Sequence, residues 1–173
     1  IGVPSDAIQV FGGMGFVEET GIAQHYRDIR ITPIYEGTTA IQSNDLVGRK
    51  VIRDDGATVN ELFTRIDATI AQLREQGEPV ATRTAERLER AVASARTATA
   101  AVLGFAASPR DAYAASDPYL MLLGTPTGGW MHGLAVDAAD SDAARLTTAD
   151  FYGAHHLPRV YALAETVAAG EIG

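Results

Sequence analysis

Hydrophobic residues recur at intervals of three and four along the middle of the chain, which is the spacing of one helix face. The first stripe begins after Thr58 and stops at the helix-breaking residues 77–79. Thr58 is followed by Glu61 three residues later, a pattern that predicts a capping box at the helix start. The stripe consists of Val59, Leu62, Phe63, Ile66, Ile70 and Leu73.

A second stripe of small and branched residues predicts a second helix. Small side chains on this face would let neighbouring helices approach closely. Pro109 is predicted to end the helix, because proline lacks a backbone N–H and clashes with the preceding turn. The stripe consists of Ala85, Leu88, Val92, Ala95, Thr99, Val102 and Ala106.

Two further apolar segments, residues 119–136 and 143–169, complete the pattern. Pro158 predicts a bend in the second of them. The first is interrupted by residues that predict a kink or a break: Gly124, Pro126, Gly128 and Gly129. No alternating pattern indicates a strand, and no repeat is present. The predicted fold class is therefore all-α.

The histidines lack the carboxylate-rich spacing of a metal site, so no metal ligands are predicted. The two adjacent ones would point about 100° apart on a helix. The four are His25, His132, His155 and His156. Trp130 and Met131, at helical spacing with Leu134, are predicted to be core residues.

Composition narrows the classes of function. The 173 residues are 46% hydrophobic and 21% charged, which is ordinary for a globular protein. The absence of cysteine excludes a disulfide scaffold and a thiolate nucleophile and fits a reducing compartment, so a cytoplasmic protein is expected. No apolar run is long enough to span a membrane. The formal charge of −8 argues against nucleic-acid binding.

Charge and pattern also divide the chain. Residues 1–53 carry a net charge of −1 and are rich in glycine, whereas the remainder carries −7 and is rich in alanine. We predict two domains, residues 1–54 and 55–173. The sequence begins with Ile1 and its first methionine is Met14, so we expect a piece of a longer protein.

The first part contains a glycine cluster, Gln9-Val10-Phe11-Gly12-Gly13-Met14-Gly15-Phe16. Three glycines within four residues let backbone amides approach a ligand such as a diphosphate. The spacing does not fit a dinucleotide-binding strand–turn–helix, and no hydrophobic strand precedes it. From pattern alone, a helix C-cap followed by a tight turn is the favoured interpretation.

A second cluster occupies residues 26–38 and contains one distinctive carboxylate. Glu36 lies between an apolar stretch and Gly37, and Thr38 is a plausible N-cap for a helix over residues 39–52. Such a carboxylate could act as a general base or be an exposed turn residue, and spacing alone favours the turn. Arg27 and Arg30 bracket Asp28 and are expected to pair with it.

The order and spacing of these clusters closely resemble the C-terminal segment of the flavin-dependent acyl-CoA dehydrogenases. The resemblance rests on Gln-x-x-Gly-Gly-x-Gly-Phe, Tyr-Arg-Asp-x-Arg-Ile and Ile-Tyr-Glu-Gly-Thr, within residues 3–53. Residues 18–21 and 44–50 look most like longer bacterial members that carry an additional helical domain. Residues 55–173 resemble that domain more loosely, at Tyr119-Leu120, Gly129-Trp130 and residues 151–163. The implied architecture is part of a C-terminal four-helix bundle followed by an accessory helical bundle.

The resemblance implies roles for particular residues. Glu36 falls on the catalytic base, which takes the α-proton of an acyl-CoA thioester while the β-hydrogen leaves as hydride to FAD. Tyr35 and Gly37 fall beside the substrate thioester. The implied FAD contacts are Gln9, Gly12, Gly13, Thr38 and Thr39, the first three in a loop that reaches the FAD of a partner subunit.

Two departures from the family pattern affect the fine FAD contacts. Ala40 stands where some members have a polar flavin-contacting residue, and Phe11 stands where the longer members commonly have histidine. The resemblance further implies a homo-oligomer, missing N-terminal and middle domains, and electron-transfer flavoprotein as the electron acceptor. The resemblance does not indicate the length or branching of the acyl chain. It also does not indicate whether the enzyme is a dehydrogenase or an oxidase.

Two alternatives to this enzyme are considered. One is a non-catalytic helical module for assembly or interaction. The other is the DNA-binding alkylation-response branch of the same family, which the charge of −7 beyond residue 53 argues against.

Overall fold

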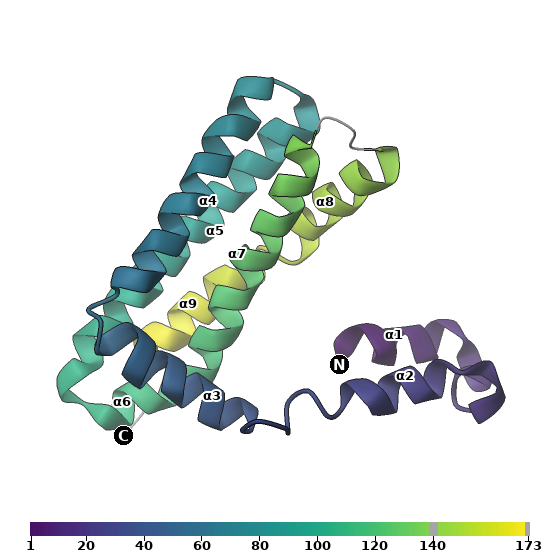
Figure 1. The fold of residues 1–173 in the computed structure, drawn as a ribbon, viewed down its shortest axis with the longest axis horizontal. Coiled ribbons are helices and arrows are strands. Elements are labelled where there is room, and N and C mark those ends of the chain that lie inside the picture. Colours follow the sequence, from purple (N-terminus) through teal and green to yellow (C-terminus); the bar gives the residue numbers. More distant parts are fainter. Residues whose placement is uncertain (139–141, 172–173) are drawn as a thin grey trace. The chain divides into compact units, whose positions relative to one another are not determined.

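The computed structural model describes residues 1–138 and 142–171, which form helices joined by turns, with no strand among them (Figure 1). The all-α prediction is therefore confirmed. The chain forms two compact units, the first from Ile1 to Gln42 and the second from Ser43 onward. In the described part, no helix is both long and apolar enough to cross a bilayer.

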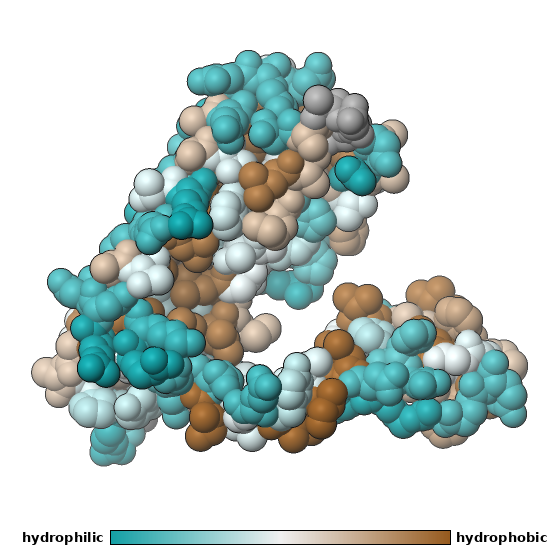
Figure 2. Space-filling view, in the orientation of Figure 1, coloured by the Kyte–Doolittle hydropathy of each residue, from teal (hydrophilic) through white to brown (hydrophobic). Residues whose placement is uncertain are grey.

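The first unit is built from short helices. They are α1 (Gly2–Val10), η1 (Gly12–Gly15), η2 (Glu18–Thr20), α2 (Ile22–Ile29) and the start of α3 (Thr39–Asp45). Only Gly15 and Ala23 are buried. Ten large apolar side chains, among them Val3, Val10 and Phe16, are exposed, and Figure 2 shows apolar surface on this unit. The unit therefore has no core of large side chains to stabilise it.

The second unit is a bundle around one apolar core. Its long helices are α4 (Ala57–Gln76), α5 (Pro79–Gly104) and α7 (Ser116–Asp137). The fourth position is shared by α8 (Ala143–His155) and α9 (Arg159–Ala169), which both contact α5 and α7 (Figure 1). The connecting elements are η3 (Leu46–Ile52, a π-helical segment), η4 (Phe105–Ala107) and α6 (Pro109–Ala114).

Helix α4 follows the predicted stripe but begins differently. Val59, Phe63 and Ile66 are buried in the core as expected. The predicted capping box is wrong, because the helix starts at Ala57 with Gly56 as its N-cap. The Asp54 carboxylate accepts hydrogen bonds from the N–H groups of Gly56 (3.0 Å) and Thr58 (3.1 Å). An aspartate before the helix thus satisfies two backbone amides at the helix start.

Helix α5 carries the predicted small-residue face, but its end is not at Pro109. The helix stops at Gly104, and Ala106 lies in η4. Pro109 instead occupies the first position of α6. Proline is tolerated there because the N–H it lacks would have no partner inside the helix.

Helix α7 is continuous in the structure, so the predicted interruption is not a break. Pro126 lies inside it, and Gly128 and Gly129 allow close packing, whereas a Cβ on Gly124 would meet no atom within 4 Å. A Cβ on Gly129 would lie 2.8 Å from Leu157 Cδ2 and 3.3 Å from Leu88 Cδ1. In this half of the helix the core face carries Gly129, Gly133 and Val136. Met131 and Leu134 lie on other sides and are 47% and 39% exposed, so the prediction that Met131 is a core residue is wrong.

Trp130, by contrast, is partly buried against the core, as predicted. Its indole N–H donates a hydrogen bond of 2.8 Å to Thr69 Oγ1. The bend predicted at Pro158 is also confirmed, because α8 ends at His155 and α9 begins at Arg159. Proline there separates the two short helices that share the fourth position of the bundle.

A tyrosine of α8 forms a hydrogen bond to the backbone of α7. Tyr152 donates its hydroxyl hydrogen to the backbone carbonyl of Thr125, with 2.9 Å between the oxygens. Gly128 makes room for it: a Cβ there would lie 2.3 Å from Tyr152 Oη. This hydroxyl can therefore reach the backbone of α7 only because residue 128 has no side chain.

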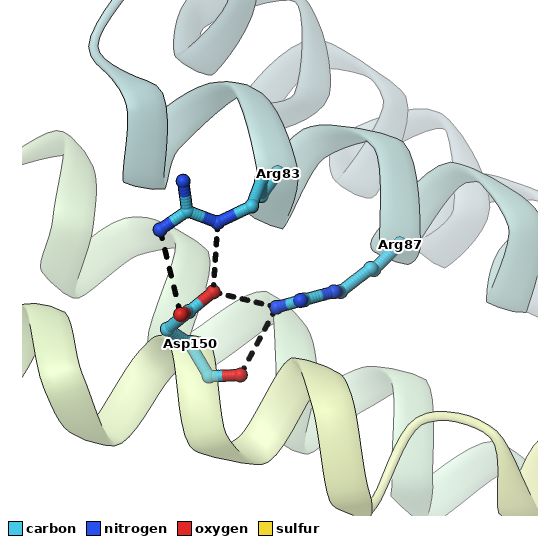
Figure 3. A network of polar contacts seen from close by, with 3 residues as sticks. All are labelled: Arg83, Arg87 and Asp150. Atoms are coloured by element: carbon cyan, nitrogen blue, oxygen red, sulfur yellow. Dashed lines mark hydrogen bonds and ion pairs between the residues drawn. The ribbon is translucent and has the colours of Figure 1, made fainter.

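Helix α8 is joined to α5 by a carboxylate between two arginines (Figure 3). Asp150 accepts hydrogen bonds from Arg83 Nε (3.1 Å) and Arg87 Nη1 (2.6 Å). Arg87 also donates to the backbone carbonyl of Asp150 at 3.0 Å. The hydrogen bonds from Arg83, and then those from Arg87, hold the pKa of Asp150 below its usual value of 3.8.

Replacing Asp150 with asparagine is expected to reduce the fall in the free energy of unfolding between pH 6 and pH 3. A carboxylate with a lowered pKa stabilises the fold above its unfolded-state pKa, near 4, and loses that contribution as pH falls through its folded-state pKa. The loss should be below about 1 kcal/mol, because the group is partly exposed. Urea unfolding at pH 6 and pH 3 measures it. An equal drop in both proteins would contradict the assignment.

Candidate functional site

The predicted site residues all lie in the first unit, in two turns. The first turn follows α1, where Gln9 is exposed in the last turn of the helix. Gly12 has a positive φ of 61°, which favours glycine, and begins the 3-10 turn η1. Gly12 and Gly13 are exposed, and a Cβ on either would meet no atom within 4 Å. The backbone here is open to an approaching ligand.

Gly15, in the same turn, has a role that sequence reasoning missed. It is buried, and a Cβ on it would lie 2.3 Å from the backbone oxygen of Ile8. This glycine lets η1 fold back against α1. The glycine cluster therefore combines a structural position, Gly15, with open positions at Gly12 and Gly13.

The second turn carries Glu36 between α2 and α3. Glu36 has a φ of +55°, in the left-handed region, and Gly37 follows with a φ of +103°. A positive φ is uncommon for residues other than glycine, asparagine and aspartate. The Gln42 side-chain amide donates a hydrogen bond of 2.6 Å to the backbone carbonyl of Glu36. Glu36 is thus held in an unfavourable backbone conformation by a side chain from α3.

The residues around Glu36 are set by the same turn. Tyr35 is 52% exposed. Thr38 precedes α3 and Thr39 is its first residue. The helix predicted over residues 39–52 is present, with its second half in the π-helical segment η3. Gln42 was not singled out from the sequence, and its only signal is a polar residue one helical turn after Thr38.

A cavity of about 540 Å³ lies in the first unit, and none of the predicted site residues lines it. It is formed by residues of α1, η1, η2 and α2 and of the turn between η1 and η2, including Phe16, Ala23 and Tyr26. At its edge Arg27 donates two hydrogen bonds to Glu18, at 2.6 and 2.7 Å. The predicted pairing of Arg27 with its neighbour Asp28 is wrong, because adjacent side chains on a helix diverge.

Metal ligation has no candidate in the described ranges. Among residues 1–138 and 142–171, no three His, Asp or Glu side chains are placed so that they could hold a metal ion.

Comparison with protein families decides the membership of the chain. Residues 62–172 match the family described as "Acetyl-CoA dehydrogenase C-terminal like". Residues 2–51 match "Acyl-CoA dehydrogenase, C-terminal domain". The chain belongs to the acyl-CoA dehydrogenase family. The resemblance read from the two sequence clusters is confirmed.

Individual acyl-CoA dehydrogenases are similar over most of the chain. The 3-methylmercaptopropionyl-CoA dehydrogenase of Ruegeria pomeroyi is 48% identical over 154 residues, which are 86% of this chain and 25% of the relative. The broad-specificity linear acyl-CoA dehydrogenase FadE5 of Mycobacterium tuberculosis is 28% identical over 94% of this chain and 30% of the relative. The chain thus spans about a quarter to a third of the length of these relatives.

A human relative from the same family matches a shorter stretch of the chain. The mitochondrial short-chain specific acyl-CoA dehydrogenase is 52% identical over 46 residues, which are 27% of this chain. The predicted boundary between the acyl-CoA dehydrogenase segment and the accessory domain, at residues 54 and 55, stays a prediction. It falls between the two family matches, whereas the compact units divide at residues 42 and 43.

Proposed function

We propose that the chain is the C-terminal part of a FAD-dependent acyl-CoA dehydrogenase in which Glu36 is the catalytic base. Family membership supports the reaction class. The observation that carries the choice of base is the left-handed backbone of Glu36, held by Gln42. Strained backbone is tolerated where the surrounding structure fixes it, and it is frequent at functional sites. Asp55 also has a positive φ, but aspartate in a turn needs no such explanation.

The proposed role of Glu36 is to accept the α-proton of an acyl-CoA thioester. The Gln42 amide fixes the backbone from which the carboxylate extends. Tyr35 and Gly37 flank the carboxylate in the same turn and are proposed to lie beside the thioester. The missing side chain of Gly37 leaves room for the turn itself, because a Cβ there would lie 3.0 Å from Gln42 Nε2 and 3.3 Å from Ile41 Cγ2. FAD, when bound, supplies the acceptor for the hydride that leaves the β-carbon. Substrate and cofactor, when bound, would exclude water from the carboxylate.

The residues proposed to contact FAD fit a diphosphate-containing group. Gly12 and Gly13 are exposed, and the space where their side chains would be is empty. Gln9 adds an exposed amide next to this backbone. Thr38 and Thr39 offer hydroxyl groups beside the Glu36 turn. These five residues are proposed as the contribution of this chain to FAD binding.

The exposed apolar surface of the first unit supports the proposal that the N-terminal and middle domains of the same protein cover it. A unit with ten exposed large apolar side chains and two small buried residues gains little from its own packing. A homo-oligomer, electron-transfer flavoprotein as acceptor and a cytoplasmic location complete the proposal.

The test of this function is a substrate screen on the longer protein, following bleaching of the flavin absorbance. Addition of a matching acyl-CoA without an electron acceptor should bleach the flavin within one turnover. A purified protein that carries flavin but is bleached by no acyl-CoA, short, long or branched, would overturn the proposal.

Replacing Gly13 with valine in the longer protein should weaken FAD retention and subunit pairing together. The side chain would occupy the space through which the diphosphate approaches the backbone. The substitution is informative because Gly13 has no positive φ and a Cβ there meets nothing within 4 Å. Gel filtration with flavin absorbance measures both properties. Unchanged flavin content in Gly13→Val would remove this residue from the proposed FAD site.

A further inference from the structure

A second polar site lies in the C-terminal part of the chain, where α7, α8 and α9 meet. A surface hollow of about 220 Å³ is lined on the α7 side by Leu120, Met121 and Gly124. Its other side carries the polar groups of Tyr152, His156 and Arg159. Among the residues that the structure describes, no carboxylate lines this hollow, although the chain has a formal charge of −8.

The arginine of this hollow is available for a ligand. Eight arginines in the described residues form ion pairs with carboxylates, and Arg159 is not among them. Arg159 is exposed at the first position of α9, and its charge opposes the rise that burial causes in the pKa of Tyr152. A free guanidinium is the group that binds carboxylates with two parallel hydrogen bonds.

The histidine beside it is held in place by stacked rings. The rings of Tyr152 and His156 are stacked, with centroids 5.0 Å apart and an interplanar angle of 23°. Tyr152 also contacts His132, at 4.6 Å between centroids. Its hydroxyl is anchored on the Thr125 carbonyl, which fixes the stack against α7. Little side-chain freedom of Tyr152 remains to be lost when a ligand binds.

We propose that this hollow binds a small carboxylate with a short apolar tail. The carboxylate would contact Arg159 and His156, and the tail would lie on Leu120 and Met121. The volume of the hollow suits a molecule of a few carbon atoms rather than a nucleotide. The residues of this site differ from those proposed above for FAD and thioester, and its test does not depend on dehydrogenase activity.

The first experiment is a titration of the 173-residue chain with butyrate, followed by amide NMR shifts. Saturable shifts are expected for residues 120–125 and 152–159. Arg159→Gln should weaken binding by roughly 10-fold to 100-fold, the usual loss for a hydrogen bond to a charged group. The matched control is Arg90→Gln, which changes an exposed arginine on α5 that has no carboxylate partner among the described residues. Equal affinity in both variants would overturn the proposal.

A second pair of variants tests the apolar wall without touching the arginine. Met121→Glu places a negative charge in the hollow and should abolish butyrate binding. Met131→Glu changes a similarly exposed residue of the same helix outside the hollow and should leave binding unchanged, since the two side chains are 56% and 47% exposed. Inorganic phosphate, which has no tail, should bind more weakly than butyrate. Binding of phosphate with equal strength would overturn the assignment of the tail, and an absence of any saturable shift would overturn the site.

Discussion

Glu36→Gln in the longer protein is expected to slow flavin reduction by acyl-CoA by about 100-fold to 10,000-fold. Removing a positioned base typically has this effect, which corresponds to about 3–5 kcal/mol of activation free energy. Glutamine keeps the size and shape of the side chain, and the hydrogen bond from Gln42 goes to the Glu36 backbone carbonyl, so the turn should persist. Folding, FAD content and binding of substrate should therefore be close to those of the parent protein.

Stopped-flow measurement of flavin bleaching under single-turnover conditions isolates the chemical step from binding. The matched control is Glu165→Gln, the same chemical change at an exposed position on α9. This control should be bleached at the parent rate. If Glu36→Gln were also bleached at nearly that rate, the base would lie elsewhere and the assignment of Glu36 would be wrong.

Phe63→Ala is expected to lower the free energy of unfolding of the bundle by about 3–5 kcal/mol. Phe63 is 1% exposed and lies on the side of α4 that faces the core. The Arg96 guanidinium lies over its ring, 4.9 Å from the ring centroid. The substitution removes the buried ring, leaves a cavity and ends that cation–π contact.

Urea unfolding of the 173-residue chain, followed by helical circular dichroism, measures this loss. Phe151→Ala is the matched control, because Phe151 is in the same bundle and 56% exposed. Exposed positions usually change stability by no more than about 0.5 kcal/mol. Similar losses in the two variants would contradict the placement of Phe63 in the core.

Features that follow from the local sequence pattern of a helix could be predicted. The stripe of α4 and the small-residue face of α5 mark one buried side each, so the spacing alone located them. Pro158 was also interpreted correctly, because proline disfavours a continuous helix whatever its surroundings. These features need no knowledge of which elements pack together.

The features that depend on partners were not predictable. Glycine disfavours a helix in isolation, but Gly129 lies in the interior of α7 because Leu88 and Leu157 pack there. Arg27 was assigned to its neighbour Asp28, whereas the fold brings Glu18 to it. Likewise, Asp54 rather than the Thr58 side chain serves the start of α4.

The candidate site likewise has some features that the sequence predicts and others that depend on how the chain folds. Family motifs were sufficient to propose Glu36, Gly12 and Gly13 from the sequence. Neither the left-handed φ of Glu36 nor the hydrogen bond from Gln42 could be inferred, because both arise from how the turn closes onto α3. The buried contact of Gly15 with Ile8 likewise depends on the path of the chain after α1.

The fit between Gly128 and Tyr152 couples two positions that are 24 residues apart in the sequence. Because even a methyl group at 128 would collide with the tyrosine hydroxyl, mutations at the two positions cannot accumulate independently. In a relative that carries a larger residue at 128, the hydroxyl at 152 must be lost, the tyrosine side chain must turn away from residue 128, or α8 must shift away from α7. Replacements at these two positions should therefore be correlated among relatives, with a tyrosine at 152 found mainly where residue 128 is glycine.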